Sequence, residues 1–173
     1  MNVQLPSDVG LGPQLITIAT AAGTSASTVD VTTTQPGLLA PPSFKIAGKQ
    51  YVAATIGTEG IYALPTGAIP GTSSRPARPG ETLTLFGVGL GPVTPTISAG
   101  EVVRQNNTLT SSIEVLFGET PAAVSYSGLA LLSVGLYQLN VVVPNVASTE
   151  PIPLSISVGG IRGSQALYTS VQD

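Results

Sequence analysis

The chain has 173 residues, which is enough for one domain with a buried core, or for one domain and part of another. Only 9% of the residues are charged, the net charge is −3, and there is no basic cluster, which argues against nucleic-acid binding. Histidine and cysteine are absent, which excludes a Ser-His-Asp triad, a thiolate nucleophile and a zinc–thiolate site. With 20 glycines, 15 prolines and no uninterrupted helical spacing of apolar residues, the composition predicts an all-β protein.

Residues 1–34 are predicted to be part of a repeated unit. The stretch "NVQLPSDVGLGPQLITIA" from Asn2 aligns without gaps to "NVVVPNVASTEPIPLSIS" from Asn140. In both copies a Pro-rich connection leads to a strand, a Gly-containing turn and a final strand, near 27–33 and 165–171. We therefore predict that residues 1–34 are equivalent to the second half of a β-sandwich. The start, "MNVQLPSDVG", lacks the basic and apolar regions of a signal peptide.

Residues 35–78 form a Pro- and Gly-rich connector in this interpretation. The segments "QPGLLAPPSF" and "PTGAIPGTSSRPARPG" flank "KQYVAATIGTEGIYAL", which is typical of a β-hairpin with its turn at residues 58–60. This hairpin is too apolar for a free linker, so we expect it to pack on a neighbouring unit.

Residues 79–173 carry the strand signals of a complete unit. The segments "ETLTLF" (81–86), "IEVLFG" (113–118), "AAVSYSG" (122–128) and "PLSISV" (153–158) alternate apolar and polar residues or end in turn signals. About seven strands at this spacing predict an antiparallel, immunoglobulin-like β-sandwich. The most apolar stretch, residues 128–146, is interrupted by polar residues and proline, so it predicts a buried strand and no membrane insertion.

Three glycines at alternate positions, Gly87, Gly89 and Gly91, follow the strand at 81–86. A dinucleotide-binding loop would need a third glycine where Pro92 stands, and a helix after it. The following "VTPTISAG" does not open a helix, so the glycines predict a sharp bend of the backbone instead.

The segments "PGETLTLFGVGLGP", "VLFGETPAAVSYSGL", "GLYQLNVVVP" and "PLSISVGG" resemble an uncharacterised C-terminal domain of secreted acidobacterial proteins. More distantly, they are similar to the IPT/TIG immunoglobulin-like domains of surface proteins. "MNVQLP", "PGLLAPPSF" and "RPARPGE" also match this family, so the resemblance covers nearly the whole chain, although the family's upstream half-domain is missing. The resemblance implies an extracellular or cell-surface sandwich and transfers no catalytic residues.

A half-sandwich cannot leave its apolar faces and backbone groups open to water. The strands within residues 1–34 can be covered in three ways. They can fold back on the hairpin of residues 50–63, complete the sheet of the second unit, or pair with another chain. We favour completion within the chain, because the connection is long enough to return. Strand exchange between copies would instead make the protein an assembly module.

Few residues suggest chemistry. Ser43 and Lys45 share a strand face if the segment is extended, which suggests a Ser-Lys nucleophile or, more simply, the wet side of a strand. Glu101, Glu114 and Glu119 could contribute to the carboxylate pair of a glycosidase, but each is more simply an exposed strand or turn position. Asp8 and Asp30 could help to bind calcium, although the sequence has no calcium-binding loop motif. The residues Asn106-Asn107-Thr108 match a glycosylation sequon and are more simply a polar hairpin turn.

Exposed aromatic rings are the usual platforms for sugars. Tyr51, Tyr62 and Tyr126 are therefore the candidate ligand contacts, although the simpler interpretation is that their rings close the ends of the sandwich with the hydroxyls at the rim. Tyr137, in "GLYQLN", is expected to be structural.

Two functional classes remain open. The first is a non-catalytic extracellular structural, adhesion or assembly module that acts through sandwich surfaces and strand exchange, with itself, a surface protein or a polysaccharide as partner. The second is a small carbohydrate-active protein, either a polysaccharide-binding module or a carboxylate-based glycoside hydrolase. The sequence assigns no catalytic, cofactor-binding or metal-binding residue.

Overall fold

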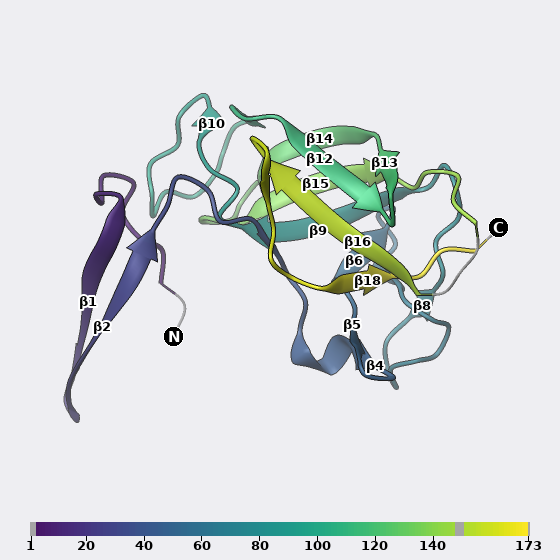
Figure 1. Ribbon diagram of the computed structural model, residues 1–173, viewed down its shortest axis with the longest axis horizontal. Coiled ribbons are helices and arrows are strands. Elements are labelled where there is room, and N and C mark those ends of the chain that lie inside the picture. The colour runs from purple at the N-terminus through teal and green to yellow at the C-terminus, as the bar shows by residue number, and fades with distance from the viewer. Residues whose placement is uncertain (1–2, 148–150, 173) are drawn as a thin grey trace.

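The computed structural model describes residues 3–147 and 151–172, and its regular structure is β-strand apart from one 3-10 helix, η1 (Pro42–Phe44) (Figure 1). This confirms the all-β prediction. The sheets are almost entirely antiparallel, and two of them pack face to face in the manner of a β-sandwich.

The first sheet is built around β9, the strand predicted from "ETLTLF". In spatial order its strands are β14 (Val124–Leu129), β15 (Tyr137–Val142), β9 (Thr82–Val88), β6 (Ala54–Ile56), β7 (Ile61–Ala63) and β8 (Ser74–Arg75). A further strand, β3 (Gly37–Leu38), pairs with the end of β9 that β6 leaves open. All these pairs are antiparallel except β7 with β8.

The second sheet is built around β16 (Ile152–Val158). Its order is β13 (Thr120–Ala122), β12 (Ile113–Phe117), β16 and β17 (Ile161–Arg162), and β18 (Leu167–Thr169) pairs with the other half of β16. In Figure 1, β12 and β16 cross in front of β9 and β15. Three two-stranded sheets complete the described chain: β10 (Val93–Thr94) with β11 (Thr108–Leu109), β4 (Lys45–Ile46) with β5 (Lys49–Gln50), and β1 (Gly12–Thr20) with β2 (Gly23–Val31).

The core lies between the two large sheets. Period-two alternation turns one face of each strand inward, so that apolar residues of both sheets form a single buried cluster. Phe117 is one of its largest fully buried side chains. The apolar residues of the alternating segments "ETLTLF" and "PLSISV" that turn to this side are all buried: Leu83, Leu85, Leu154, Ile156 and Val158.

The predicted hairpin of the connector lies within the first sheet. Its strands are β6 and β7, its turn spans residues 57–60, and β6 pairs with β9. The segment expected to pack on a neighbouring unit is therefore part of the same sheet as β9. Its flanking residues Phe44, Tyr51 and Leu64 form a second, smaller buried cluster.

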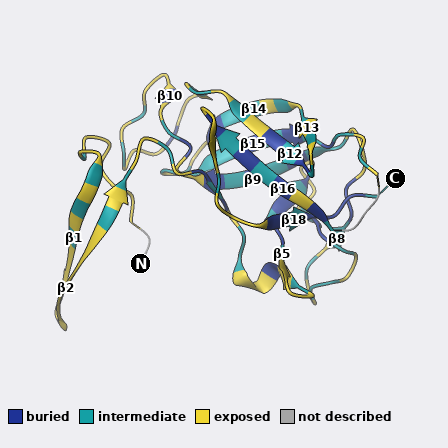
Figure 2. Cartoon of the chain, viewed as in Figure 1, coloured by how far each residue is buried: buried dark blue, intermediate teal, exposed yellow. Residues whose placement is uncertain are grey.

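The hairpin β1–β2 lies away from the sandwich, at the far left of Figure 1. Its nine paired positions run from Gly12 opposite Val31 to Thr20 opposite Gly23, and neither strand pairs with any other strand of the described chain. Figure 2 shows it without fully buried residues, in contrast to the strands of the sandwich. The completion within the chain that we favoured from the sequence is therefore wrong for this structure.

Residues 34–39, which we call the crossing segment, carry the chain from the hairpin into the sandwich. The segment runs along the end of β9, where the Gln35 amide donates to the Gly89 carbonyl at 2.9 Å and the Leu39 amide donates to the Phe86 carbonyl at 2.8 Å. On its other side the Gln165 side chain accepts from the Leu38 amide at 2.7 Å and donates to the Leu38 carbonyl at 3.0 Å.

This crossing explains the alternate glycines. A Cβ atom at Gly87 would lie 2.7 Å from the Gly37 carbonyl oxygen, and one at Gly89 would lie 2.3 Å from the Gln35 carbonyl oxygen. At Gly91 it would lie 2.8 Å from the Thr34 methyl group. The predicted bend is therefore a place where two backbones approach too closely for any side chain.

Replacing Gly89 by alanine should destabilise the sandwich more than replacing Gly71, whose Cβ would meet nothing within 4 Å. Both glycines have positive φ, +71° and +75°, so both variants carry the strain of a left-handed alanine, about 1–2 kcal/mol. Only Gly89→Ala must also displace the crossing segment. Equal losses in the free energy of unfolding, measured by denaturant titration, would show that the close approach does not matter.

Candidate functional site

The hairpin β1–β2 has one markedly apolar face. In an antiparallel pair, directly opposite residues and residues two apart share a face. The register therefore places four aliphatic side chains together, which we call the apolar face: Ile16, Ile18, Val29 and Val31. Ile18 is 41% exposed, and the other three are half-buried. The opposite face carries Leu15, which is 71% exposed, among threonines and alanines.

The outer edge of β1 has little protection against pairing. Natural edge strands are blunted by charged side chains, bulges or proline, because their free N–H and C=O groups are a template for another strand. Apart from Pro13 near its start, β1 carries none of these, and its sequence has no charged residue. The sole charge on β2 is Asp30. This edge is therefore open to strand addition.

The base of the hairpin is tied to the sandwich on both sides. On the N-terminal side, the Gln4 side chain accepts a hydrogen bond from the Gly100 amide at 2.8 Å and packs so closely that a Cβ at Gly135 would lie 2.8 Å from it. On the C-terminal side the crossing segment is fixed to β9. The hairpin thus projects from an anchored base.

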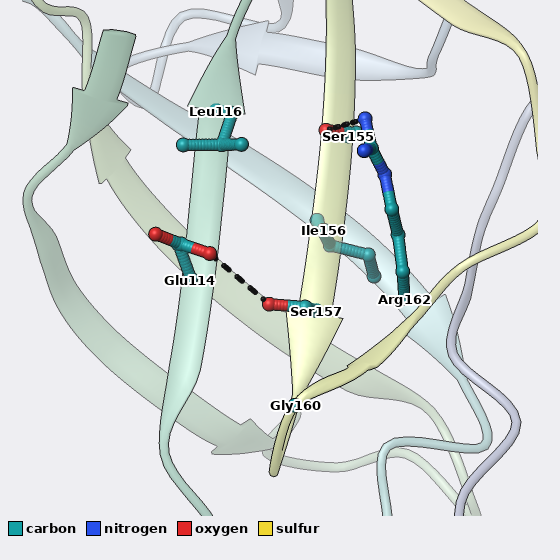
Figure 3. Close-up of a pocket in the computed structure, with 7 residues that line it drawn as sticks. All are labelled: Glu114, Leu116, Ser155, Ile156, Ser157, Gly160 and Arg162. Atoms are coloured by element: carbon teal, nitrogen blue, oxygen red, sulfur yellow. Dashed lines mark hydrogen bonds between the residues drawn. The ribbon is translucent and has the colours of Figure 1, made fainter. Parts of the chain in front are cut away.

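A shallow groove of about 250 Å³ lies on the outer face of the second sheet (Figure 3). Most of its polar side chains form hydrogen bonds with each other. The Ser157 hydroxyl donates to Glu114 at 3.3 Å, and the Arg162 guanidinium donates to the Ser155 hydroxyl at 3.2 Å. The groove holds one acid and no aromatic ring among its lining residues: Glu114, Leu116, Ser155, Ile156, Ser157, Gly160 and Arg162.

The three candidate tyrosines do not form a platform. Tyr51 is 4% exposed, so its ring cannot offer a face to a ligand. Tyr62 is half-buried on β7 and makes an edge-to-face contact with Phe44, with ring centroids 5.0 Å apart. Tyr126 is half-buried on β14, and its hydroxyl donates to the Leu129 carbonyl at 2.9 Å. Since β7 and β14 are separated by three strands, Tyr62 and Tyr126 do not meet.

Two half-buried tyrosines, Tyr126 and Tyr137, have hydroxyls that are harder to ionise than a free one. Desolvation raises the pKa of Tyr126 and of Tyr137. The Tyr137 hydroxyl donates to the Gly91 carbonyl, which ties β15 to the glycine-rich end of β9. Tyr137 therefore has the structural role expected from the sequence.

The remaining candidates lie apart on the surface. Ser43 belongs to η1 and not to a strand, so the shared strand face with Lys45 assumed from the sequence is wrong; both residues are exposed. The acidic candidates are also exposed: Glu101, Glu114, Glu119, Asp8 and Asp30. Within residues 3–147 and 151–172, no three acidic side chains gather where they could hold a metal ion.

The sequon region has a structural function that the sequence did not reveal. Asn107 is 2% exposed, and its side chain pairs with the main chain of β14. Its carbonyl oxygen accepts from the Leu129 amide at 2.6 Å, and its amide donates to the Leu129 carbonyl at 3.1 Å. The neighbouring Asn106 is exposed. The alternation of exposed and buried residues is too irregular in this loop to have predicted the difference.

Arg75 and Glu81 form the ion pair of the described chain. The Arg75 guanidinium donates to both carboxylate oxygens, at 2.9 and 2.7 Å, and the Arg78 amide donates to the same carboxylate at 2.8 Å. The hydrogen bond from Arg75 is the main cause that lowers the pKa of Glu81. This carboxylate therefore fixes the turn that leads into β9.

Comparisons with protein-family models, curated proteins and solved structures found no match. Among the described residues, no helix is long and apolar enough to cross a membrane.

Replacing Asn107 by aspartate should destabilise the protein by at least about 2 kcal/mol at neutral pH, because it removes the donor to Leu129 and buries a charge. Burial raises the pKa of a carboxyl, so the loss should grow as the pH rises from 4 to 7. Thermal unfolding of Asn107→Asp, compared with the exposed control Asn106→Asp, measures the loss of stability at neutral pH and its change between pH 4 and 7. Equal stability of the two variants would contradict this role.

The stabilising contribution of Glu81 should depend on pH in the opposite direction. Its pKa is lowered in the folded state, so its contribution is present above the unfolded pKa and is lost as the pH falls through the folded pKa. Between pH 7 and pH 3, the wild type should therefore lose more stability than Glu81→Gln. Parallel unfolding curves of the two proteins over this range would contradict the prediction.

Proposed function

We propose that the protein is a non-catalytic structural or adhesion module of the extracellular space or cell surface that assembles by strand pairing through its β1–β2 hairpin. The observation that carries the proposal is the hairpin itself, which projects from an anchored base with an apolar face and an open β-edge. An extracellular location is supported by the family resemblance in the sequence.

The energetics favour pairing over an isolated hairpin. A two-stranded hairpin is at best marginally stable in water, because it covers neither of its faces. Full burial of one valine or isoleucine side chain contributes about 1.5–3 kcal/mol, and the apolar face carries four of them. Backbone hydrogen bonds along β1 would add to this, against the entropic cost of association.

Polysaccharide binding, the alternative function, has less support from the geometry. The three candidate tyrosines are dispersed or buried, and the groove on the second sheet is shallow and lacks an aromatic ring. Sugar recognition normally combines ring stacking with convergent polar groups. The groove supplies polar groups without an aromatic ring for stacking.

Light scattering over a range of concentrations tests the assembly function. We expect the molar mass of the wild type to rise above that of a monomer with concentration. The double variant Ile16→Ser/Ile18→Ser should remain monomeric, because it removes half of the apolar face. Leu15→Ser is the matched control on the opposite face and should associate like the wild type.

A wild type that stays monomeric at every concentration would contradict assembly through the hairpin. If Leu15→Ser lost association to the same extent as the double variant, this would also contradict the proposal, since the apolar face would then contribute no more to association than the opposite face. The circular dichroism spectrum of each variant checks that the sandwich is intact.

A further inference from the structure

The hairpin β1–β2 repeats the local structure of β16 and β17. The sequence repeat aligns Ile18 with Ile156, and the structure extends the alignment through the turn. In the hairpin, Thr20 lies opposite Gly23; in the sandwich, the aligned Val158 lies opposite Ile161, again with two residues between them. The hairpin is thus the counterpart of the last hairpin of a sandwich.

The inward faces of the two copies also correspond. Continued without gaps, the alignment matches Ile16 to Leu154, Ile18 to Ile156, Val29 to Leu167 and Val31 to Thr169. Every one of these counterparts is buried in the core of the sandwich. The apolar face of the hairpin therefore occupies the position of a core face, although its residues belong to none of the buried clusters of the described chain.

The sandwich shows which strand such a hairpin accepts. On the edge of β16 that faces away from β17, β12 pairs antiparallel, with Val115 opposite Ile156 and Phe117 opposite Leu154. The counterparts of Ile156 and Leu154 on the free edge of β1 are Ile18 and Ile16. A strand with apolar residues at alternate positions, like those of β12, would meet them in the same register.

An intact second copy does not offer such a strand. Its β12 already lies between β13 and β16. If β1 of one copy displaced β16 of another, the polar residues Gln14 and Thr20 would take the places of the buried Ile152 and Val158. Polar side chains fill an apolar core less well than the residues that they would replace. The favoured occupant is therefore a sandwich in which this place is empty.

We propose that the partner of the hairpin is an open β-sandwich that lacks its last hairpin and presents an edge strand of the β12 type. The outer edge of β1 adds antiparallel to this strand, and Ile16, Ile18, Val29 and Val31 close the open core. This inference rests on the proposed function and specifies its partner. Association between hairpins of separate copies then occurs where such a partner is missing.

A disulfide test reads the register directly, because the native chain has no cysteine. The probe is a synthetic peptide with the sequence of residues 111–123, which contains β12 and β13, and the protein is the full chain carrying Ile18→Cys. Opposite residues of an antiparallel pair have Cα atoms about 4.5–5.5 Å apart, within the range of a disulfide. The peptide with Val115→Cys should therefore couple to the chain.

Peptides with Glu114→Cys or Leu116→Cys are the matched controls, because a shift by one residue turns the thiol to the other face. We expect coupling through Val115→Cys to be about tenfold faster than through either control, because a disulfide needs Cβ atoms close together on one face. Equal coupling of the three peptides would overturn the proposal, as would coupling no faster than that of a scrambled peptide.

Disulfide-linked dimers of the Ile18→Cys chain that the peptide does not suppress would identify a second copy as the occupant, and would also overturn the proposal. The outcome is separable from that of the proposed function. A protein that associates in light scattering but shows no register preference retains the assembly function and loses this partner. A monomeric protein that couples in register retains the partner and loses association with itself.

Discussion

The close approach of two backbone segments determines how this chain is arranged. The crossing segment runs over Gly87, Gly89 and Gly91 at distances that leave no space for a Cβ atom. It pairs with β9 on one side, and on the other side the Gln165 side chain forms hydrogen bonds with both the amide and the carbonyl of Leu38. Since the crossing segment begins three residues after the last residue of β2, Val31, the same contacts that complete the sandwich also fix the base of the hairpin.

This constraint joins two parts of the chain that differ in how they are stabilised. In the sandwich, strand pairing and burial act together, because each large sheet covers the apolar face of the other. In the hairpin, the strands pair but no side chain is fully buried, and the face that corresponds to the inward face of the sandwich stays outside the core. Comparison of the two copies therefore distinguishes the stability that a β-hairpin gains from its own strand pairing from the stability that it gains by packing on a core.

Much of the sandwich followed from residue patterns. Alternation identified the inward residues of β9 and β16, and the turn at residues 58–60 identified the hairpin β6–β7. The glycines predicted a bend but not its cause, because the carbonyl of Gln35 comes from a segment distant in sequence. The burial of Tyr51 and Asn107 also depends on distant neighbours, Tyr168 and Leu129, which no local pattern specifies. The expectation that residues 1–34 are completed within the chain was wrong, because β1 and β2 pair only with each other in the described chain.

The two turns of the repeat show why the hairpin depends on an external contribution. In the sandwich, Gly159 and Gly160 have φ values of +55° and +82°, which match the twist of a two-residue hairpin. Their counterparts are Ala21 and Ala22, and the described non-glycine residues with positive φ are Ala47 and Leu132 alone. The hairpin β1–β2 thus closes through a turn that lacks the positive φ values suited to the twist of its strands, and no residue on either face is fully buried. A nine-pair ladder under these conditions gains most from a third strand on its open edge, because that strand supplies hydrogen bonds and burial at once.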